Sequence, residues 1–343
     1  MIAALALTGY AVLVGAVAPY GLARARWAHR APAVAVLAWQ GLMVTFVVSV
    51  ALAAYHLVLT EEHVHRGVVG LLSICGVAAD APVGSGGAPV DSGGAPVGSG
   101  GAPVGSGGAP AVPSAAPGAS SAVSAAPPAG GAVPLLVPAA VVLLPLGSLL
   151  RTAWRSRRAR QRRLDLLALV GVPAPEYGAT VVEHDVPAVY CLPGRRRRVV
   201  VSRGALDVLS DDQLRAVLAH EHAHLAGRHH LLHMATDAFA RAFPGLPLAR
   251  HARAQTALLL EMAADDRALR RHPRETLAAA MCEVAAGRAP RGALGAGGPG
   301  TLIRVRRVLA PQPRPHRATW LAIVAASVAA PVFPLLLTCG PTL

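Results

Sequence analysis

The sequence predicts a mainly α-helical, polytopic membrane protein with four transmembrane helices and one cytoplasmic α+β domain that carries a small β-hairpin. Three observations lead to this fold class. Hydrophobic residues make up 53% of the 343 residues and charged residues only 15%. The mean hydropathy is +0.47, and the apolar residues gather in four long stretches. This balance is typical of a membrane protein rather than of a large soluble core.

The four apolar stretches cover approximately Ile2–Leu22, Val34–Leu59, Val133–Ala153 and Trp320–Leu337. Each is long enough to cross a bilayer, which requires a helix of roughly 20 residues. The first stretch has no charged residue before Arg24, so it lacks the basic start of a cleavable signal peptide and is expected to remain. We therefore assign two transmembrane helices to residues 1–60, a third to residues 133–154 and a C-terminal one to residues 319–343.

The net charge of +14 is distributed unevenly along the chain. Arginines follow the first and third spans, whereas no Lys or Arg occurs between Arg66 and Arg151. Because basic loops stay on the cytoplasmic side, we expect a multi-pass protein of the cell membrane with both termini outside and residues 155–318 inside. Membrane topology thus explains the excess of positive charge. We expect the chain to contact the lipid bilayer and not to bind nucleic acid. The run Arg195–Arg198 suits a solvated turn or a lipid-headgroup contact.

Residues 61–132 form the predicted extracytoplasmic loop, which contains the tandem repeat GSGGAPV. With no aromatic residue and almost no charge, the repeat cannot bury a core, and we expect a flexible tether. Cys75 and Cys339 both fall outside, where a disulfide could form, although the sequence cannot report their distance. Cys191 and Cys282 face the reducing cytoplasm and are expected to be free thiols.

The segment 155–318 is the only part of the chain large enough for a catalytic domain. A basic helix is expected at about Arg155–Val170, and the stretches PAVYCL (187–192) and RVVVS (198–202) predict a β-hairpin. Ser210 and Gln213 form a capping-box pattern that predicts the start of a helix running from about Asp211 past Leu231. A second strong helix is predicted over 252–271.

The first of these helices contains the H-E-x-x-H pattern, with His220, Glu221 and His224. Residues four apart share one face of a helix, so the two histidines can direct their imidazoles to one metal ion. Glu221 is turned by about 100° from His220, which places it beside the metal as a general base for water. This pattern predicts a zinc site with one Zn²⁺ per chain.

A catalytic zinc needs a third protein ligand, and the helix 252–271 offers one in Glu261. Asp265 lies one turn further on the same face, where it can accept the free N–H of a ligand histidine. His222 is expected to point away from the metal, and His229, His230 and His233 are expected at the surface or an interface. One of these three could stabilise the oxyanion. Gly227, without a side chain, could let the Glu261 helix approach.

The stretches RAVLAHEHAHLAGRHH and EMAADDRAL, with apolar spans before and after them, resemble the membrane-anchored zinc metallopeptidases of the BlaR/MecR type. The heat-shock protease HtpX and the CAAX prenyl endopeptidases, also gluzincins, are more distantly similar. The resemblance implies a zincin-like domain in which His220, His224 and Glu261 hold zinc, Glu221 activates water and Asp265 supports a ligand histidine. This sequence departs from the family pattern at His222, where such families usually have an apolar residue. It also departs after the last span, where no β-lactam-sensing domain is expected.

These features predict a membrane zinc metalloendopeptidase that cleaves a protein or peptide substrate on the cytoplasmic side. The resemblance implies regulatory proteolysis, for example of a cytosolic transcriptional repressor. Two alternatives stay open at this stage. One is housekeeping cleavage of damaged membrane proteins, and the other is a catalytically silent membrane scaffold or sensor that keeps zinc for structure. The strand at Arg198–Ser202 could pair with an extended substrate.

Overall fold

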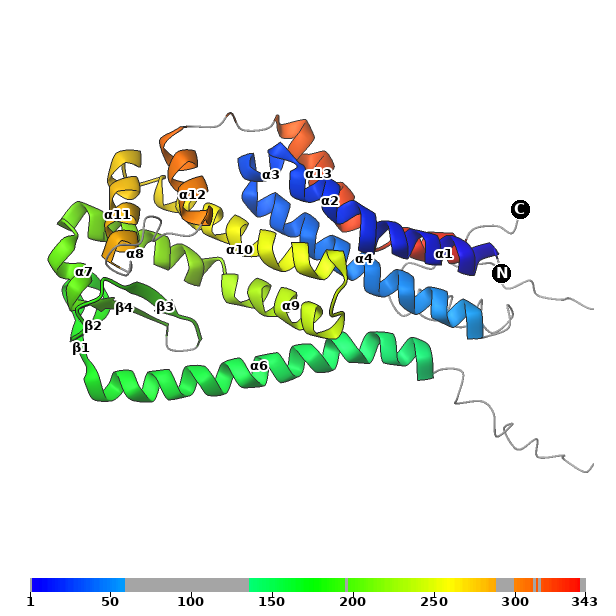
Figure 1. Ribbon diagram of the computed structural model, residues 1–343, viewed down its shortest axis with the longest axis horizontal. Helices are drawn as coiled ribbons and strands as arrows, with labels where there is room; N and C mark the ends of the chain where they lie inside the picture. Colours follow the sequence, from blue (N-terminus) through cyan, green and yellow to red (C-terminus); the bar gives the residue numbers. More distant parts are fainter. Residues whose placement is uncertain are drawn as a thin grey trace, which may run out of the picture.

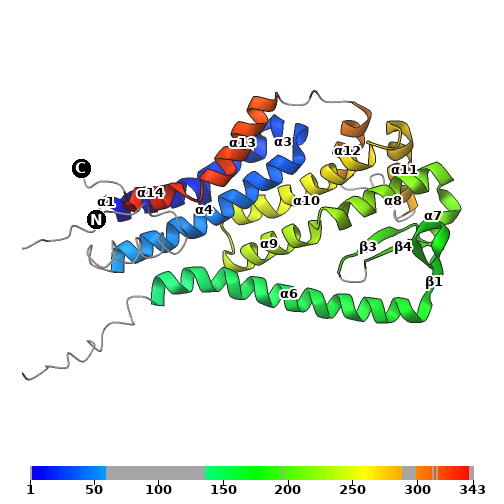
Figure 2. The same cartoon turned by 180° about the vertical axis from the view of Figure 1, so that it is seen from behind.

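The structure is a computed structural model that describes residues 2–58, 136–194, 197–287, 299–310, 313 and 316–339. It is mostly helical, with apolar helices gathered at one end and a small sheet at the other (Figure 1). The view from behind shows the same division, with α6 running along one side from the apolar end to the sheet (Figure 2). The repeat segment and Cys75 lie outside the described residues, so the extracytoplasmic tether and the disulfide stay predictions.

Three helical segments are long and apolar enough to span a membrane: Ile2–Arg24, Pro32–Val58 and Leu136–Val170. The first comprises α1 (Ile2–Val12), a wider helical turn at Leu13–Val17 and α2 (Ala18–Arg24). The second is α4 (Pro32–Val58), and a short α3 (Arg26–Arg30) joins the two. Their core includes Trp39, which is fully buried. The first two of these helical segments therefore lie where the sequence analysis expected apolar helices long enough to span a membrane.

The fourth predicted span consists of two shorter helices, α13 (Arg317–Ala329) and α14 (Phe333–Cys339). The chain turns at Ala330–Val332, which includes Pro331 and is followed closely by Pro334. Both prolines disfavour a continuous helix. α13 packs closely on α4, since a Cβ added to Gly41 would lie 2.5 Å from the carbonyl oxygen of Ser327. Four spans are not confirmed, and the fourth stays a prediction.

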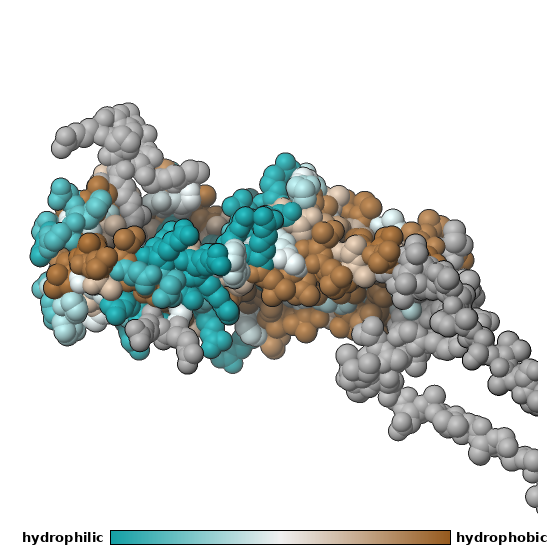
Figure 3. All heavy atoms as spheres, turned by 90° about the horizontal axis from the view of Figure 1, so that it is seen from below, coloured by the Kyte–Doolittle hydropathy of each residue, from teal (hydrophilic) through white to brown (hydrophobic). Residues whose placement is uncertain are grey.

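The predicted third span and the basic helix after it are one continuous helix, α6 (Leu136–Val170). At 1.5 Å per residue it is about 50 Å long, and no helix-breaking residue separates its apolar and basic parts near Ala153. Viewed from below, the molecule shows hydrophobic surface over the apolar end and hydrophilic surface beyond it (Figure 3). Two hydrogen bonds connect α6 to α9 (His229–Ala242). Ser148 Oγ donates to the Ala238 carbonyl, and the Arg241 guanidinium donates to the Thr152 hydroxyl.

The sheet has four strands in the order β1-β2-β4-β3. The predicted hairpin is present as β3 (Val189–Leu192) and β4 (Arg198–Ser202), which pair antiparallel. Two strands that the sequence analysis missed precede it: β1 (Gly171–Ala174) and β2 (Ala179–Val182), connected by a short helical turn at Pro175–Tyr177. β4 lies inside the sheet, paired with β2 on one side and β3 on the other. The suggestion that β4 pairs with substrate was therefore wrong, because both its edges are occupied.

The remaining helices build the half of the molecule next to the sheet. They are α7 (Arg203–Val208), α8 (Asp211–Ala226), α9, α10 (Pro247–Ala268), α11 (Arg274–Gly287) and α12 (Pro299–Leu309). α10 runs through the middle, where it packs against α4, α8 and α9. Its buried residues Leu259, Leu260 and Met262 share a core with Trp39 of α4. One continuous core thus joins the apolar helices to the half that carries the histidines.

Candidate metal centre

The histidine helix α8 begins where the sequence predicts. Ser210 accepts a hydrogen bond from the Gln213 backbone N–H, and Gln213 Oε1 accepts one from the Ser210 N–H at 2.9 Å. Asp211 and Asp212 occupy the first turn, where negative charge favours the helix. The helix ends at Ala226 and does not continue past Leu231, because Arg228 adopts a left-handed conformation with φ of 50°. The predicted single helix is therefore two helices, α8 and α9.

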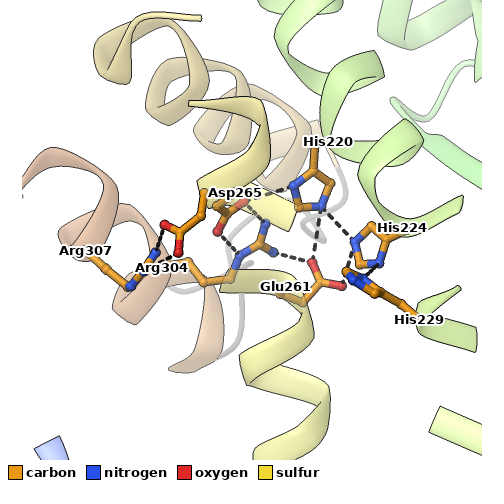
Figure 4. A network of polar contacts seen from close by, with 8 residues as sticks. His220, His224, His229, Glu261, Asp265, Arg304 and Arg307 are labelled. Atoms are coloured by element: carbon orange, nitrogen blue, oxygen red, sulfur yellow. Dashed lines mark hydrogen bonds and ion pairs between the residues drawn. The ribbon is translucent and has the colours of Figure 1, made fainter. Parts of the chain in front are cut away.

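The structure brings His220, His224 and Glu261 together at the contact of α8 with α10 (Figure 4). The Nε2 atoms of the two histidines are 3.1 Å apart. Glu261 Oε2 lies 3.5 Å from His220 Nε2, and its Oε1 lies 3.3 Å from His224 Nε2. Ligands about 2.1 Å from a tetrahedral zinc are separated by about 3.4 Å from one another. The spacing and the donor set therefore fit a zinc ion held by these three residues.

Asp265 lies behind His220, as the sequence analysis expected, and is completely buried. Its Oδ1 is 3.0 Å from His220 Nδ1, on the side of the ring away from Glu261. Burial opposes ionisation of this carboxyl, but hydrogen bonds from Arg304 and His220 outweigh it and lower its pKa to about 2. The carboxylate is thus placed to hold the proton on His220 Nδ1 and leave Nε2 free for a metal.

Arg304 of α12 is a site residue that the sequence analysis missed. Its guanidinium binds Asp265 through two hydrogen bonds of 2.9 and 2.7 Å, and its Nη1 contacts Glu261 Oε2 at 2.7 Å. This cation compensates two carboxylates that are mostly or fully buried, an arrangement that stabilises buried charge only when the geometry is good. In the stretch LIRVRRVL, nothing distinguishes Arg304 from Arg306 and Arg307.

The two histidines differ in their protonation. Burial disfavours the charged form of His220, but Asp265 and Glu261 outweigh it and raise its pKa to about 9. Burial lowers the pKa of His224 to about 4, with Glu261 acting in the opposite direction. Burial would raise the pKa of Glu261, yet His220 and Arg304 lower it to about 2. At neutral pH, without metal, the positive charges of His220 and Arg304 therefore balance the two carboxylates.

His229 lies against His224 and is buried, whereas the sequence analysis expected it at the surface or an interface. Its side chain is buried, and its Nδ1 is 2.9 Å from His224 Nδ1 (Figure 4). The ring occupies the space beside Gly227, where an added Cβ would lie 2.4 Å from His229 Nε2. The missing side chain of Gly227 thus makes room for His229, and the idea that it lets the Glu261 helix approach was wrong.

If His224 directs Nε2 to a metal, its Nδ1 carries the proton and donates it to His229, which orients the ring. We expect His229→Ala to weaken zinc binding by about 10- to 100-fold, the usual effect of losing such a partner. Competition with a fluorescent chelator measures the affinity. His229→Asn, which restores an acceptor, should recover part of it, and His230→Ala should change little. Equal affinity in His229→Ala and the unsubstituted protein would contradict this role.

Glu221 faces a cavity of about 150 Å³ that also borders His220, Glu261 and Arg304. Burial raises the pKa of this carboxyl, while the charge of His220 and a hydrogen bond with the Cys191 thiol act against the rise. Cys191 comes from β3, and burial followed by the charge of Glu221 raises its pKa to about 12, so it is a neutral free thiol. A larger cavity of about 690 Å³ lies beside His222 and contains none of the three metal donors.

Comparison with known proteins gives one match. Residues 153–307 match the model of peptidase family M48. The matched range begins in α6 and ends in α12, so it contains the sheet, His220, His224, Glu261 and Arg304. This match supports a zinc metallopeptidase and does not distinguish the BlaR/MecR type. No curated protein and no solved structure matches the chain.

Proposed function

From the M48 match over residues 153–307, we propose that this chain is a membrane-anchored zinc metalloendopeptidase whose active site lies between α8 and α10. The observation that carries the proposal is the spacing of three donor groups, His220, His224 and Glu261, at 3.1 to 3.5 Å. Glu221 lies next to them on the wall of a cavity large enough for a reacting group. A structural zinc site would have no need of that cavity or that carboxylate.

The roles of the side chains follow from their positions. When bound, zinc supplies Lewis-acid polarisation of the peptide carbonyl and of water. Glu221 accepts a proton from the attacking water and passes it to the nitrogen of the leaving amine as the C–N bond breaks. Asp265 holds the proton on His220 Nδ1, and His229 accepts the corresponding hydrogen bond from His224. Arg304 keeps Glu261 and Asp265 ionised, so that Glu261 remains available as a ligand.

Besides the charged groups, apolar side chains line much of this cavity. They are Val189, Val217, Leu277, Ala280, Met281 and Val284. A polar or charged group placed there would lose water without gaining a partner, which costs free energy. We therefore infer that the substrate has an apolar residue beside the bond that is cleaved. Digestion of a random peptide library by the zinc-loaded protein, read by mass spectrometry, tests both the cleavage and this preference.

Strand β3, not β4, offers a free edge for an extended substrate. No other strand in the described part of the chain pairs with its outer edge. The Ser202 N–H donates to the Ala188 carbonyl at 2.9 Å, so the alternation of an antiparallel pair directs the backbone groups of Val189 and Cys191 outward. Val189 also lines the cavity beside Glu221. A peptide paired with β3 would thus lie close to the metal donors.

Replacing Cys191 provides a matched test of this pairing. We expect Cys191→Pro to raise the KM for peptides strongly and to lower kcat as well, because proline removes an outward N–H that a paired substrate needs and that donates to the Glu221 carboxylate in the absence of substrate. Cys191→Ala loses the same thiol but keeps the N–H, and it should retain most of the activity. Zinc content reports whether each variant folds. If Cys191→Pro and Cys191→Ala cleave equally well, the substrate does not pair with β3 at this position.

We further propose that the active site faces the cytoplasm and that cleavage is regulatory. A cytosolic transcriptional repressor is an example of the substrate that we expect. The arginine groups after the first and third spans favour this orientation. Loss of the protein should then stabilise one or a few cytosolic proteins. Broad accumulation of damaged membrane proteins would instead favour the housekeeping role. Measuring the proteome of a deletion strain separates the two.

A further inference from the structure

A cavity of about 340 Å³ between α3 and α12 is lined mainly by basic side chains. α3 contributes Arg26, His29 and Arg30, and α12 contributes Arg306, Arg307 and the apolar Ile303. Ala310, which follows α12 directly, completes the lining. Arg307 Nε donates a hydrogen bond to the His29 carbonyl at 2.7 Å, so the two helices are in direct contact. Among the described residues, no acidic side chain lines this cavity.

Most of the positive charge at this cavity is uncompensated. Arg307 is paired with Asp266 at 2.7 Å. Arg26, Arg30 and Arg306 are exposed, and none of them has an ion-pair partner within the part of the chain that the structure describes. Guanidinium groups present several N–H donors in a planar fork that matches the oxygens of a phosphate. Three free arginines around one cavity therefore favour a phosphate-bearing anion.

The position of the cavity indicates where that phosphate comes from. α3 connects the first two apolar helices, and α12 leads into the apolar α13 (Figure 1). A second cavity of about 520 Å³ shares Arg30 and is lined by apolar side chains that include Val34, Trp320 and Leu321. Asp266, which is paired with Arg307, and the basic Arg270 and Arg317 also line it. The two cavities thus adjoin at Arg30, and the surface of the second is mainly apolar and lies beside two helices of the apolar bundle. An acyl chain would occupy the apolar part of the second cavity, which free phosphate would leave empty.

We propose that the cavity between α3 and α12 binds the phosphate headgroup of an anionic phospholipid, with an acyl chain along the groove formed by Val34, Trp320 and Leu321. The proposal rests on the membrane location and not on the peptidase activity. α12 also carries Arg304, one turn before Arg307, and Arg304 binds Glu261 and Asp265. A lipid that holds α12 against α3 therefore also holds Arg304 in place at the metal donors.

The test uses the full chain, purified in a neutral detergent, with a soluble short-chain phosphatidylglycerol as the probe. Native mass spectrometry counts bound lipid, and a titration followed by thermal melting gives the affinity. We expect one tightly bound phosphatidylglycerol and a raised melting temperature. Each arginine near a membrane surface contributes about a fivefold factor in affinity. The double variant Arg26→Gln/Arg306→Gln should therefore bind about 25-fold more weakly.

A matched control removes the same charge elsewhere. Arg157→Gln/Arg162→Gln alters two exposed arginines of α6, and its lipid affinity should be unchanged. The variant Arg26→Lys/Arg306→Lys keeps the positive charge but loses the planar guanidinium groups. It should bind phosphatidylglycerol more tightly than the Gln double variant does. Equal weakening in both Gln doubles would overturn the proposal, since diffuse charge would then explain the binding. Phosphatidylcholine or inorganic phosphate binding as tightly as phosphatidylglycerol would overturn it as well. The elution volume in size-exclusion chromatography and the circular dichroism spectrum show that each variant is folded, and both are independent of whether the chain holds zinc.

Discussion

Glu221→Gln is expected to abolish peptide cleavage while leaving one zinc ion per chain. The substitution keeps the shape of the side chain and removes only its ability to take a proton from water. A positioned general base typically contributes a factor of 10² to 10⁴ to the rate, so kcat should fall on the order of a thousandfold. Because Glu221 does not belong to the donor group formed by His220, His224 and Glu261, zinc content should not change.

The measurement compares kcat for the best peptide from the library digestion with zinc determined by elemental analysis. Glu283→Gln is the matched control, since it makes the same change at an exposed position of α11. The outcome also separates the proposed peptidase from a silent scaffold. A scaffold would keep its cellular role in the Glu221→Gln strain, whereas a peptidase would lose it. Peptide cleavage that survives in Glu221→Gln would remove this carboxylate from the mechanism.

His224→Ala and Glu261→Ala are each expected to lose zinc during purification. Each change removes one of three protein ligands and leaves two, which is fewer than catalytic zinc sites use. Elemental analysis of the purified chain should find about one zinc per chain before the change and little after it. Glu261→Ala also leaves the guanidinium of Arg304 with one carboxylate partner instead of two, so a lower melting temperature should accompany the loss of metal.

His222→Ala is the control for these two variants. His222 lies on the same helix but is exposed, and its Nδ1 is 2.7 Å from the Leu218 carbonyl, away from the donor group. It should keep its zinc. If His222→Ala loses zinc as readily as His224→Ala, the metal does not sit between α8 and α10. A folded chain that holds no zinc at all would end the peptidase proposal, while the lipid site could still be tested.

Local patterns in the sequence predicted much of the fold. The apolar stretches located the first two apolar helices, because a helix that could cross a bilayer needs an uninterrupted apolar sequence of a set length. Ser210 and Gln213 located the start of α8 because a capping box depends only on residues that are close in sequence. The spacing of His220 with His224, and of Glu261 with Asp265, placed each pair on one helix face for the same reason.

Most of the misses concern contacts between residues far apart in the chain, and one concerns the local turn at the end of α8. β1 and β2 are only four residues long each and depend on their neighbours in the sheet. Their sequences alone therefore did not predict strands. The end of α8 was misplaced because Arg228 takes a left-handed conformation that lets His229 turn back onto His224. The residues around Arg228 are mostly Ala and His, which are compatible with a helix. Helix propensity therefore did not indicate the end of α8, and tertiary packing decides where the helix ends.

The sequence by itself determined which residues could serve as zinc ligands and general base, because helix periodicity is a property of neighbouring residues. Only the tertiary structure decided that Arg304, from a helix about 40 residues further on, neutralises Glu261 and Asp265, and that His229 supports His224. It also decided that β3 and not β4 has the free edge. The physical reason is the same each time: burying charge, orienting an imidazole and pairing strands all depend on partners that the chain brings together only when it folds.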